Sequence, residues 1–278
     1  MKQSNQNTIN DILKKIENEL EYITLEEIVE YSGFSYFHFH RIFFAYAGEN
    51  LKQYIKRIRL EKAAYELQYQ NIPITQVALK AGFSTPSAFN KAFKEFFHTN
   101  PSKYKTINLR KKEFSMIEPV EIIENIEPIK VYSIRHIGDY NKISCAFEKL
   151  MHWIYTNKIK NKKNLMGKNA YTYGIAYDDP NVTDIDKLRS DACVSATDDV
   201  EMIHGIFKQE ISGGKYAVFL HKGEYCKLKD TYNDIFSSYI KENDIKLRDV
   251  PIFERYLNRD PRRTKPENLK TEIHIPIE

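Results

Sequence analysis

The chain has 278 residues, which is longer than a typical single domain and favours two domains. Hydrophobic residues make up 42% and charged residues 29%, as in an ordinary globular protein. The sequence has no apolar run long enough to span a membrane, which excludes a membrane partner. Its polar N-terminus lacks the apolar core of an export signal, which predicts a cytoplasmic location. The net charge of +4 is uneven, because residues 31–112 hold 14 basic and 4 acidic residues, a balance that suits a polyanion such as nucleic acid but equally a solubilising surface.

An amphipathic helix is predicted near the start of the chain, ahead of the basic segment. Apolar residues recur there at helical spacing, namely Ile9, Ile12, Leu13, Ile16 and Leu20. We expect this helix to pack its apolar face on the elements that follow.

Two copies of a pattern of helix, tight turn and helix come next. Residues 23–35 read ITLEEIVEYSGFS and residues 72–84 read IPITQVALKAGFS, a repeat at an offset of 49. Gly33 and Gly82 end the first helix of each copy, because glycine adopts a positive φ at low cost. The sequence therefore predicts two helix-turn-helix motifs in one chain.

The starts of these helices carry signals of their own. Thr24 and Glu27 form a capping box, and Thr85 followed by Pro86 starts the second helix of the second copy. Between the copies, residues 50–70 predict one continuous helix of about 19 residues, roughly 28 Å long at ~1.5 Å per residue. A helix of this length can hold two recognition helices about one DNA turn apart.

These motifs resemble the DNA-binding domain of the AraC family of transcription regulators. The resemblance rests on GFSYFHFHRIFFAYAG, QYIKRIRLEKAAYEL and ITQVALKAGFSTPSAFNKAFKEFFHTNPSKYK, and it covers residues 8–106. It implies an all-α domain that places one helix of each motif in successive major grooves of double-stranded DNA. It also implies RNA polymerase as a protein partner.

The resemblance assigns the DNA-facing side chains of the two recognition helices, which are Phe37, His40, Arg41, Pro86, Ser87 and Lys91. Arg41 can donate two hydrogen bonds to a guanine, or it can bind only a phosphate, as can Lys91. Phe37 can touch a thymine methyl group or pack on the neighbouring helix. Because neither Pro86 nor Ser87 can form a bidentate hydrogen bond with a base, we expect the first recognition helix to dominate sequence specificity.

A second repeat organises the acidic half of the chain. RHIGDYNKI at 135–143 and LHKGEYCKL at 220–228 share an H-x-G-[D/E]-Y pattern, and a helical pattern follows each. Each copy reads as strand, helix, strand, strand, which predicts an α+β domain of two pseudo-symmetric β-α-β-β units with a ligand site between them. His136 and His221 occupy equivalent positions, which favours a role in the fold over catalysis.

Residues 118–278 resemble the GyrI-like effector-binding domain. The match rests on RHIGDY, YDDP, GGKYAVFLHKGEY, FERYLN and EIHIPIE. The resemblance implies a binding domain for small, often apolar or cationic compounds, and some domains of this kind stand C-terminal to an AraC-type DNA-binding domain. No cofactor is expected. The basic, polar segment 107–117 is then the predicted linker.

Glu254 is the central candidate for ligand contact, because the resemblance assigns this role to the glutamate of the FE-x-Y pattern. Strand alternation places Tyr256 on the same face, and the repeat, aligned at an offset of 81 on its D-P-x-x-T motif, adds Tyr171 and Tyr173. A carboxylate among tyrosines suits an apolar cation, since ring faces attract cations and the negative charge offsets ligand desolvation. The predicted ligand-binding residues are Glu254, Trp153, Tyr171, Tyr173, Tyr177 and Tyr256.

Alternatives stay open at this site. Glu254 is otherwise a solvated strand carboxylate or the partner of Arg255, Arg262 or Arg263. Trp153 is as readily a core residue as a wall of the ligand site.

The combined features predict a sequence-specific, DNA-binding transcription regulator that responds to a small, apolar or cationic effector and is not an enzyme. The alternatives are that the C-terminal domain hydrolyses small electrophiles, with a glutamate as acid or base, or that it binds a protein. The sequence shows no Ser-His-Asp or Cys-His constellation and no metal-ligand spacing. Cys145, Cys193 and Cys226 are interpreted as small, reduced core residues.

Overall fold

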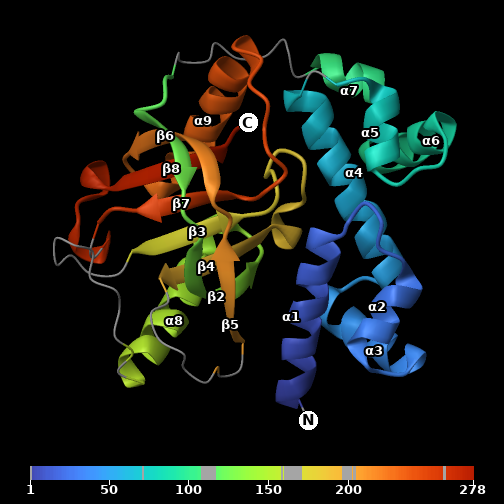
Figure 1. The fold of residues 1–278 in the computed structure, drawn as a ribbon, viewed down its shortest axis with the longest axis horizontal. Coiled ribbons are helices and arrows are strands. Elements are labelled where there is room, and N and C mark those ends of the chain that lie inside the picture. Colours follow the sequence, from blue (N-terminus) through green and yellow to red (C-terminus); the bar gives the residue numbers. More distant parts are fainter. Residues whose placement is uncertain are drawn as a thin grey trace. The chain divides into compact units, whose positions relative to one another are not determined.

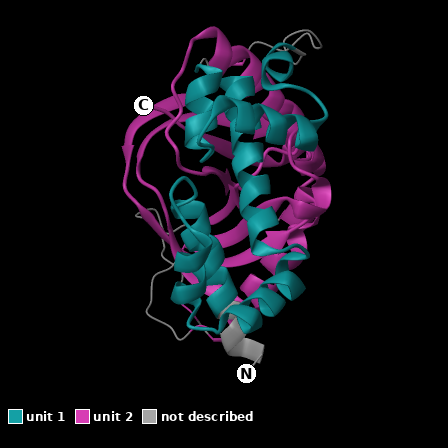
Figure 2. Ribbon diagram, turned by 90° about the vertical axis from the view of Figure 1, so that its right-hand side faces the viewer, with its two compact units in different colours: residues 1–112 teal, residues 113–278 magenta. Residues whose placement is uncertain are grey.

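The computed structural model divides the chain into two compact units, residues 1–112 and 113–278 (Figure 2). The described residues are 2–70, 72–107, 117–157, 159, 171–195, 202, 205–258 and 261–278. Most of the predicted linker, 107–117, lies outside them. None of the helices in these ranges is both long and apolar enough to cross a membrane.

The described part of the N-terminal unit is built from helices (Figure 1). They are α1 (Lys2–Asn18), α2 (Leu25–Ser32), α3 (Tyr36–Ala47), α4 (Leu51–Tyr69), α5 (Ile74–Lys80), α6 (Pro86–Phe97) and α7 (Pro101–Ile107). The continuous helix predicted between the two repeat copies is α4, with 19 residues. The apolar side chains predicted to face inward near the start of the chain are buried.

The predicted helix boundaries are confirmed by their capping contacts. The Thr24 hydroxyl accepts a hydrogen bond from the Glu27 backbone N–H, and the Glu27 carboxylate accepts one from the Thr24 N–H at 2.8 Å. Gly33 and Gly82 have φ angles of 66° and 74°, in the left-handed region that glycine adopts without strain. Thr85 caps α6 through its hydroxyl oxygen.

Two hydrophobic cores share α4. Leu51 and Ile55, in the N-terminal half of α4, are buried in the core formed with α1, α2 and α3. Ala64 and Leu67, in the C-terminal half, are buried where α4 packs on α5, α6 and α7. Each core thus holds one helix-turn-helix motif, α2–α3 in the first and α5–α6 in the second.

The C-terminal unit contains one antiparallel sheet. Its described strands are β1 (Glu121–Ile126), β2 (Ile129–Ile137), β3 (Thr172–Ala176), β4 (Arg189–Ser195), β5 (Ile206–Ile211), β6 (Gly214–Lys222), β7 (Ile252–Tyr256) and β8 (Lys270–Pro276). These eight strands follow the order β1-β6-β8-β7-β3-β4-β2-β5 (Figure 1). Because β3 pairs with β7, the two repeat copies form one continuous sheet.

The first strand of each repeat copy is exchanged. β1 precedes the first copy of the H-x-G motif but pairs with β6 of the second copy, and β5 pairs with β2 of the first. The repeat predicted the two-copy α+β architecture, which the structure confirms, but it did not predict this exchange.

Helices lie on one face of the sheet. They are α8 (Ser144–Thr156) and α9 (Leu228–Asp234), which continues into the π-helical segment η4 (Ile235–Ile240). Short 3₁₀ turns occur at η1 (Tyr140–Lys142), η2 (Ile185–Lys187), η3 (Tyr225–Lys227), η5 (Pro261–Arg263) and η6 (Pro266–Asn268). α8 packs on β2 and β4, and the rings of Phe219 and Tyr239 join β6 to η4.

The two equivalent histidines close the same turn in each copy. The Nε2 atom of His136 lies 2.9 Å from the backbone oxygen of Asp139, and that of His221 lies 3.1 Å from the backbone oxygen of Glu224. This shared contact supports the predicted role of both histidines in the fold.

The interpretation of the cysteines as core residues is correct for Cys193 and wrong for Cys145 and Cys226. Cys193 is buried on β4, whereas the other two thiols are exposed. α8 turns Ala146 and Leu150 inward, so the helical period leaves Cys145 on the outer side of its first turn.

Candidate functional site

Phe37 and Arg41 lie on the solvent side of α3. Phe37 is 81% exposed and contacts the edge of the Tyr36 ring, and Arg41 is exposed one turn later. Within the described residues, Phe37 does not pack against a neighbouring helix, which was the alternative left open above. The inner side of α3 is fixed by Phe39 and Phe43, which are fully buried.

His40 is less accessible than its two predicted companions. Its ring packs against Tyr36, with ring centroids 4.3 Å apart, and lies 5.6 Å from the ring of Phe39. Within the described residues its Nε2 atom is buried and lacks a hydrogen-bond partner. His40 thus sits at the edge of the exposed face of α3 and not at its centre.

The second motif presents a smaller exposed group. Pro86, Ser87 and Lys91 are all exposed on α6, opposite the buried rings of Phe89 and Phe93. Except for His40, the structure therefore places each predicted set of DNA-contacting side chains on the outer side of one helix.

Glu254 lies on the sheet face that α8 covers. α8 packs on β2 and β4 in a core that contains Tyr132 and Val194. Val194 pairs with Thr172, and Thr172 pairs with Tyr256. Because residues paired across neighbouring strands share a face, Tyr256 points to the helical side, as does Glu254 two residues earlier.

Two tyrosines hold the Glu254 carboxylate. The Tyr232 hydroxyl, from α9, donates to Oε1 at 2.9 Å, and the Tyr256 hydroxyl donates to Oε2 at 2.7 Å. Glu254 itself is only partly buried, and among the described residues it has no cationic partner. The carboxylate is therefore positioned by neutral donors, and its charge is not balanced by this part of the chain.

Burial shifts the proton equilibria of this group. It raises the pKa of Glu254, and the hydrogen bonds from Tyr256 and Tyr232 oppose that rise. Burial, and to a smaller extent the charge of Glu254, holds the pKa of Tyr232 and of Tyr256 well above the ordinary value. The same two causes raise the pKa of Tyr225 to about 12. The phenols consequently remain protonated donors at neutral pH.

Two further rings complete what we name the Glu254 cluster, which consists of Glu254, Tyr256, Tyr232, Tyr225 and Phe147. Phe147 from α8 and Tyr225 from η3 both meet the Tyr256 ring edge to face at a centroid distance of 5.5 Å. A carboxylate bordered by aromatic rings attracts an organic cation through charge and through the ring quadrupoles.

Gly174 makes room for this cluster. It pairs directly with Glu254 across the β3–β7 junction. A Cβ atom at Gly174 would lie 2.5 Å from the Tyr256 hydroxyl oxygen and 3.5 Å from Glu254 Oε2. A side chain at this position would therefore displace the hydroxyl that holds the carboxylate.

The predicted placement of Tyr171 and Tyr173 beside Glu254 is wrong. The strands correspond at an offset of 80, from Thr172–Ala176 to Ile252–Tyr256, and not at the 81 of the following loop motif. A slip of one residue moves every side chain of a strand to the other face. Tyr173 accordingly pairs with Arg255, on the face opposite the helices.

The three misplaced tyrosines belong to a core on that opposite face. Tyr173 packs against Phe253, and Tyr171 lies under the Arg255 guanidinium at 5.1 Å. Tyr177 donates a hydrogen bond to Asp191 at 2.7 Å. None of these contacts brings Tyr171, Tyr173 or Tyr177 into the Glu254 cluster.

Two alternatives for the site are decided by these contacts. Arg255 is not the partner of Glu254, because its Nε donates to Glu272 at 2.6 Å on the other face. Trp153 is 3% exposed and packs edge to face on Tyr132, which makes it a core residue of α8.

Sequence reasoning missed Tyr232, Tyr225, Phe147 and Gly174. Phe147 and Tyr232 stand in the helical patterns after the repeated motif, where apolar spacing alone indicates core. Tyr225 is part of the motif itself, and its repetition was the available signal. Nothing local marks Gly174, because its role depends on a strand partner about 80 residues away.

Comparisons with known proteins cover both units. The GyrI-like small molecule binding domain family matches residues 121–278, and a helix-turn-helix domain family matches residues 28–107. The chain is 23% identical to the transcriptional regulator Rob of Salmonella typhimurium over 285 aligned positions, which span 97% of each chain. It is 39% identical to the probable transcription factor PqrA of Proteus vulgaris over 103 residues, which are 36% of this chain and 84% of PqrA. The crystal structure of the EcmrR C-terminal domain has 20% identity and a TM-score of 0.45, and the alignment covers 57% of this chain and 97% of that one.

Proposed function

The chain belongs to the AraC-type transcription regulators that carry a C-terminal GyrI-like small-molecule-binding domain, and from this premise we propose that an apolar organic cation bound at the Glu254 cluster controls how the protein binds its DNA sites. The observation that carries the proposal is the partly buried carboxylate of Glu254, which two phenols hold and no described cation balances. As a transcription regulator the protein acts on RNA polymerase, which we propose as its protein partner.

On the DNA side, α3 and α6 each enter one major groove of two adjacent half-sites. Phe37, Arg41 and, at the edge, His40 face the first half-site, and Pro86, Ser87 and Lys91 face the second. The exposure of all these side chains except His40 supports this assignment, as does the basic charge of residues 31–112. Arg41 has the planar fork that reads guanine, which makes α3 the more specific of the two helices.

On the effector side, a cation gains charge pairing with Glu254 and contact with the rings of Tyr256, Tyr225 and Phe147. Because the phenol donors already satisfy one lone pair of each carboxylate oxygen, the ligand needs no hydrogen-bond donor of its own. Such a ligand changes DNA binding only if its affinity differs between the DNA-bound and free states of the protein. A coupling of typical size changes DNA affinity by about 5- to 150-fold.

Arg41→Ala is expected to weaken binding to the specific site by about 10- to 100-fold and binding to random duplex by much less, because it removes base contacts worth about 1–3 kcal/mol. Fluorescence anisotropy on labelled duplexes measures both affinities. Lys52→Ala, which removes an exposed charge from α4, is the matched control and should weaken both affinities alike. If Arg41→Ala weakened binding to the specific and the random duplex by the same factor, Arg41 would contact only phosphate.

Gly174→Ala is expected to weaken binding of tetraphenylphosphonium by about tenfold, because the new methyl group displaces the Tyr256 hydroxyl from Glu254. The same substitution in a Tyr256→Phe background is the control, since the displaced hydroxyl is then absent. Isothermal titration calorimetry on all four chains gives the coupling. Identical losses in both backgrounds would show that Gly174 acts on the strand and not through Tyr256.

The direct test of the proposed function is selection of bound sequences from a random DNA library, with and without a panel of apolar cations. We expect a bipartite consensus whose recovery changes when a cation is present. Absence of any enriched sequence would contradict the DNA assignment, and an enrichment that no cation changes would contradict the effector assignment.

A further inference from the structure

Arg59 lies near the middle of α4, between the two cores of the N-terminal unit, and it is half-buried. The recognition helices of the two motifs belong to different cores, and α4 is the helix they share. A side chain that contacts both motifs at this point affects how the two recognition helices are placed relative to each other.

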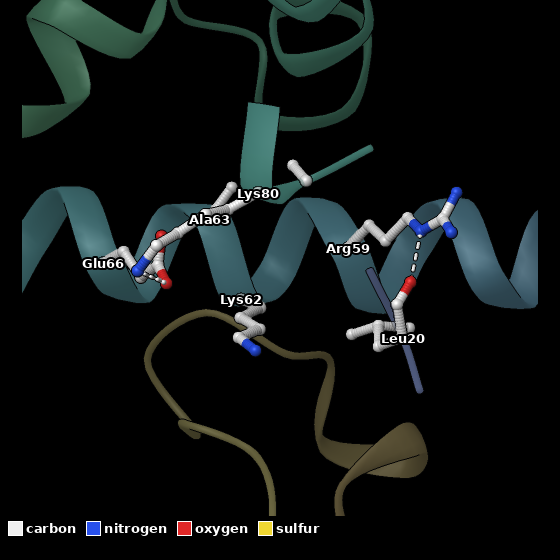
Figure 3. A pocket seen from close by; sticks show the side chains of 7 residues that line it. Leu20, Arg59, Lys62, Ala63, Glu66 and Lys80 are labelled. Atoms are coloured by element: carbon white, nitrogen blue, oxygen red, sulfur yellow. Dashed lines mark hydrogen bonds and ion pairs between the residues drawn. The ribbon is translucent and has the colours of Figure 1, made fainter. Parts of the chain in front are cut away.

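Towards the first motif, the Arg59 guanidinium binds the turn between α1 and α2. Its Nε donates to the Leu20 backbone oxygen at 2.8 Å (Figure 3), and its Nη2 lies 3.4 Å from the oxygen of Glu21 and 3.3 Å from that of Ile23. These three carbonyls precede Thr24, the capping residue from which the first motif begins. A single planar group therefore fixes the chain entering the motif.

Towards the second motif, the same guanidinium lies against Gly82, in the turn between α5 and α6. A Cβ atom at Gly82 would be 3.0 Å from the Arg59 Cζ and Nη1 atoms. Two requirements therefore favour glycine at position 82. The backbone has a φ of 74°, which glycine adopts without strain, and the Arg59 guanidinium occupies the space that a side chain would need.

A small pocket beside Arg59 marks the same junction (Figure 3). It is lined by Leu20 from the turn between α1 and α2, by Arg59, Lys62, Ala63 and Glu66 of α4, and by Lys80 and Ala81 at the end of α5. The turn before the first motif and the end of the first helix of the second motif therefore meet around one stretch of α4.

We propose that Arg59 is a positioning residue that fixes the arrangement of the two recognition helices and so sets the spacing of DNA half-sites that the protein accepts. The inference rests on the proposed binding of α3 and α6 to adjacent half-sites. One added base pair moves a half-site by about 3.4 Å along the duplex and turns it by about 35°. A protein whose two motifs are clamped to the same guanidinium cannot follow that change, whereas one without the clamp can.

The experiment measures the spacing penalty, which is the ratio of dissociation constants for the selected site with one inserted base pair and for the unaltered site. For the wild-type full-length chain we expect a penalty of about tenfold or more. For Arg59→Ala we expect weaker binding to the unaltered site and a penalty reduced to about threefold or less. Arg59→Lys keeps the charge but loses the planar fork, so its penalty should fall in the same direction.

The ratio separates positioning from simple destabilisation. A variant that only reduces the folded fraction binds both duplexes more weakly by one factor and leaves the penalty unchanged. Lys52→Ala, which removes a cation from the exposed side of α4, should keep the wild-type penalty. A wild-type penalty in both Arg59 variants would overturn the proposal, and so would a wild-type chain that binds tightly at either spacing. Failure of the wild type to bind any duplex would instead refute the proposed function.

Discussion

Arg135→Met is expected to destabilise the C-terminal unit by about 3–5 kcal/mol, because it leaves a buried carboxylate without its cation. The Arg135 Nε donates to Asp191 Oδ1 at 2.6 Å, and the two side chains are 4% and 0% exposed. Tyr177 and Gln209 also donate to Asp191, at 2.7 and 2.8 Å, but both are neutral. Methionine retains most of the arginine volume, so the loss measures the missing charge more than a cavity.

Urea unfolding followed by tryptophan fluorescence measures this effect in the full chain. Trp153 is the single tryptophan of the sequence and is buried in the C-terminal unit, so its signal reports on that unit. Lys130→Met, at an exposed position of β2, is the matched control and should change stability by no more than about 0.5 kcal/mol. Combining Arg135→Met with Asp191→Asn should restore part of the loss, and a double variant less stable than the single one would contradict the ion-pair explanation.

Glu254→Gln is expected to weaken binding of tetraphenylphosphonium by about 30-fold or more while leaving DNA affinity unchanged. Glutamine keeps the size of the side chain and one oxygen acceptor for Tyr232 or Tyr256, but it removes the charge. Triphenylphosphine oxide, a neutral aromatic of similar size, should bind both chains alike. Glu267→Gln, at an exposed position of the same unit, should bind the cation like the wild type. Parallel losses of cation and DNA affinity would refute the division between the two units.

The affinity of the wild-type chain for this cation is expected to depend on pH. Because burial raises the pKa of Glu254, lowering the pH protonates this group earlier than an exposed glutamate. The probe cation carries a permanent charge, so its affinity for the wild type should fall as the pH decreases through that raised pKa, and its affinity for Glu254→Gln should stay flat. The stability of the fold changes with pH in the opposite direction to cation affinity. Burying the ionised carboxylate costs no stability below the pKa that Glu254 has in the unfolded chain, and the cost is complete above its raised pKa in the folded chain. Glu254→Gln should therefore not lower stability at neutral pH.

Local signals made most of the fold predictable. Helix starts at Thr24 and Thr85 and helix ends at Gly33 and Gly82 depend on contacts within a few residues, and the repeats revealed the two-copy architecture. The candidate site was less predictable. The position of Glu254 came from the family resemblance, but its neighbours depend on strand register, which the extra residue between strand and loop motif in the second copy obscured.

The burial of individual polar groups was the least predictable feature. Tyr171, Tyr173 and Tyr177 have the composition of a ligand site and occupy a structural core instead. No sequence pattern distinguishes Tyr177, which donates to Asp191, from Tyr232, which donates to Glu254, because in each case the acceptor lies on a different element of the fold.

The exchange of β1 and β5 joins the two halves of the C-terminal unit through shared strand pairing. Each half obtains one border of its sheet from the other, with Glu121 set against Val218 and Ile129 against Ile211. A lone half would expose an unpaired strand edge ready to recruit a second molecule. The arrangement is that of two swapped subunits joined in one polypeptide, and where the two halves meet one copy contributes Gly174 and the other contributes Glu254.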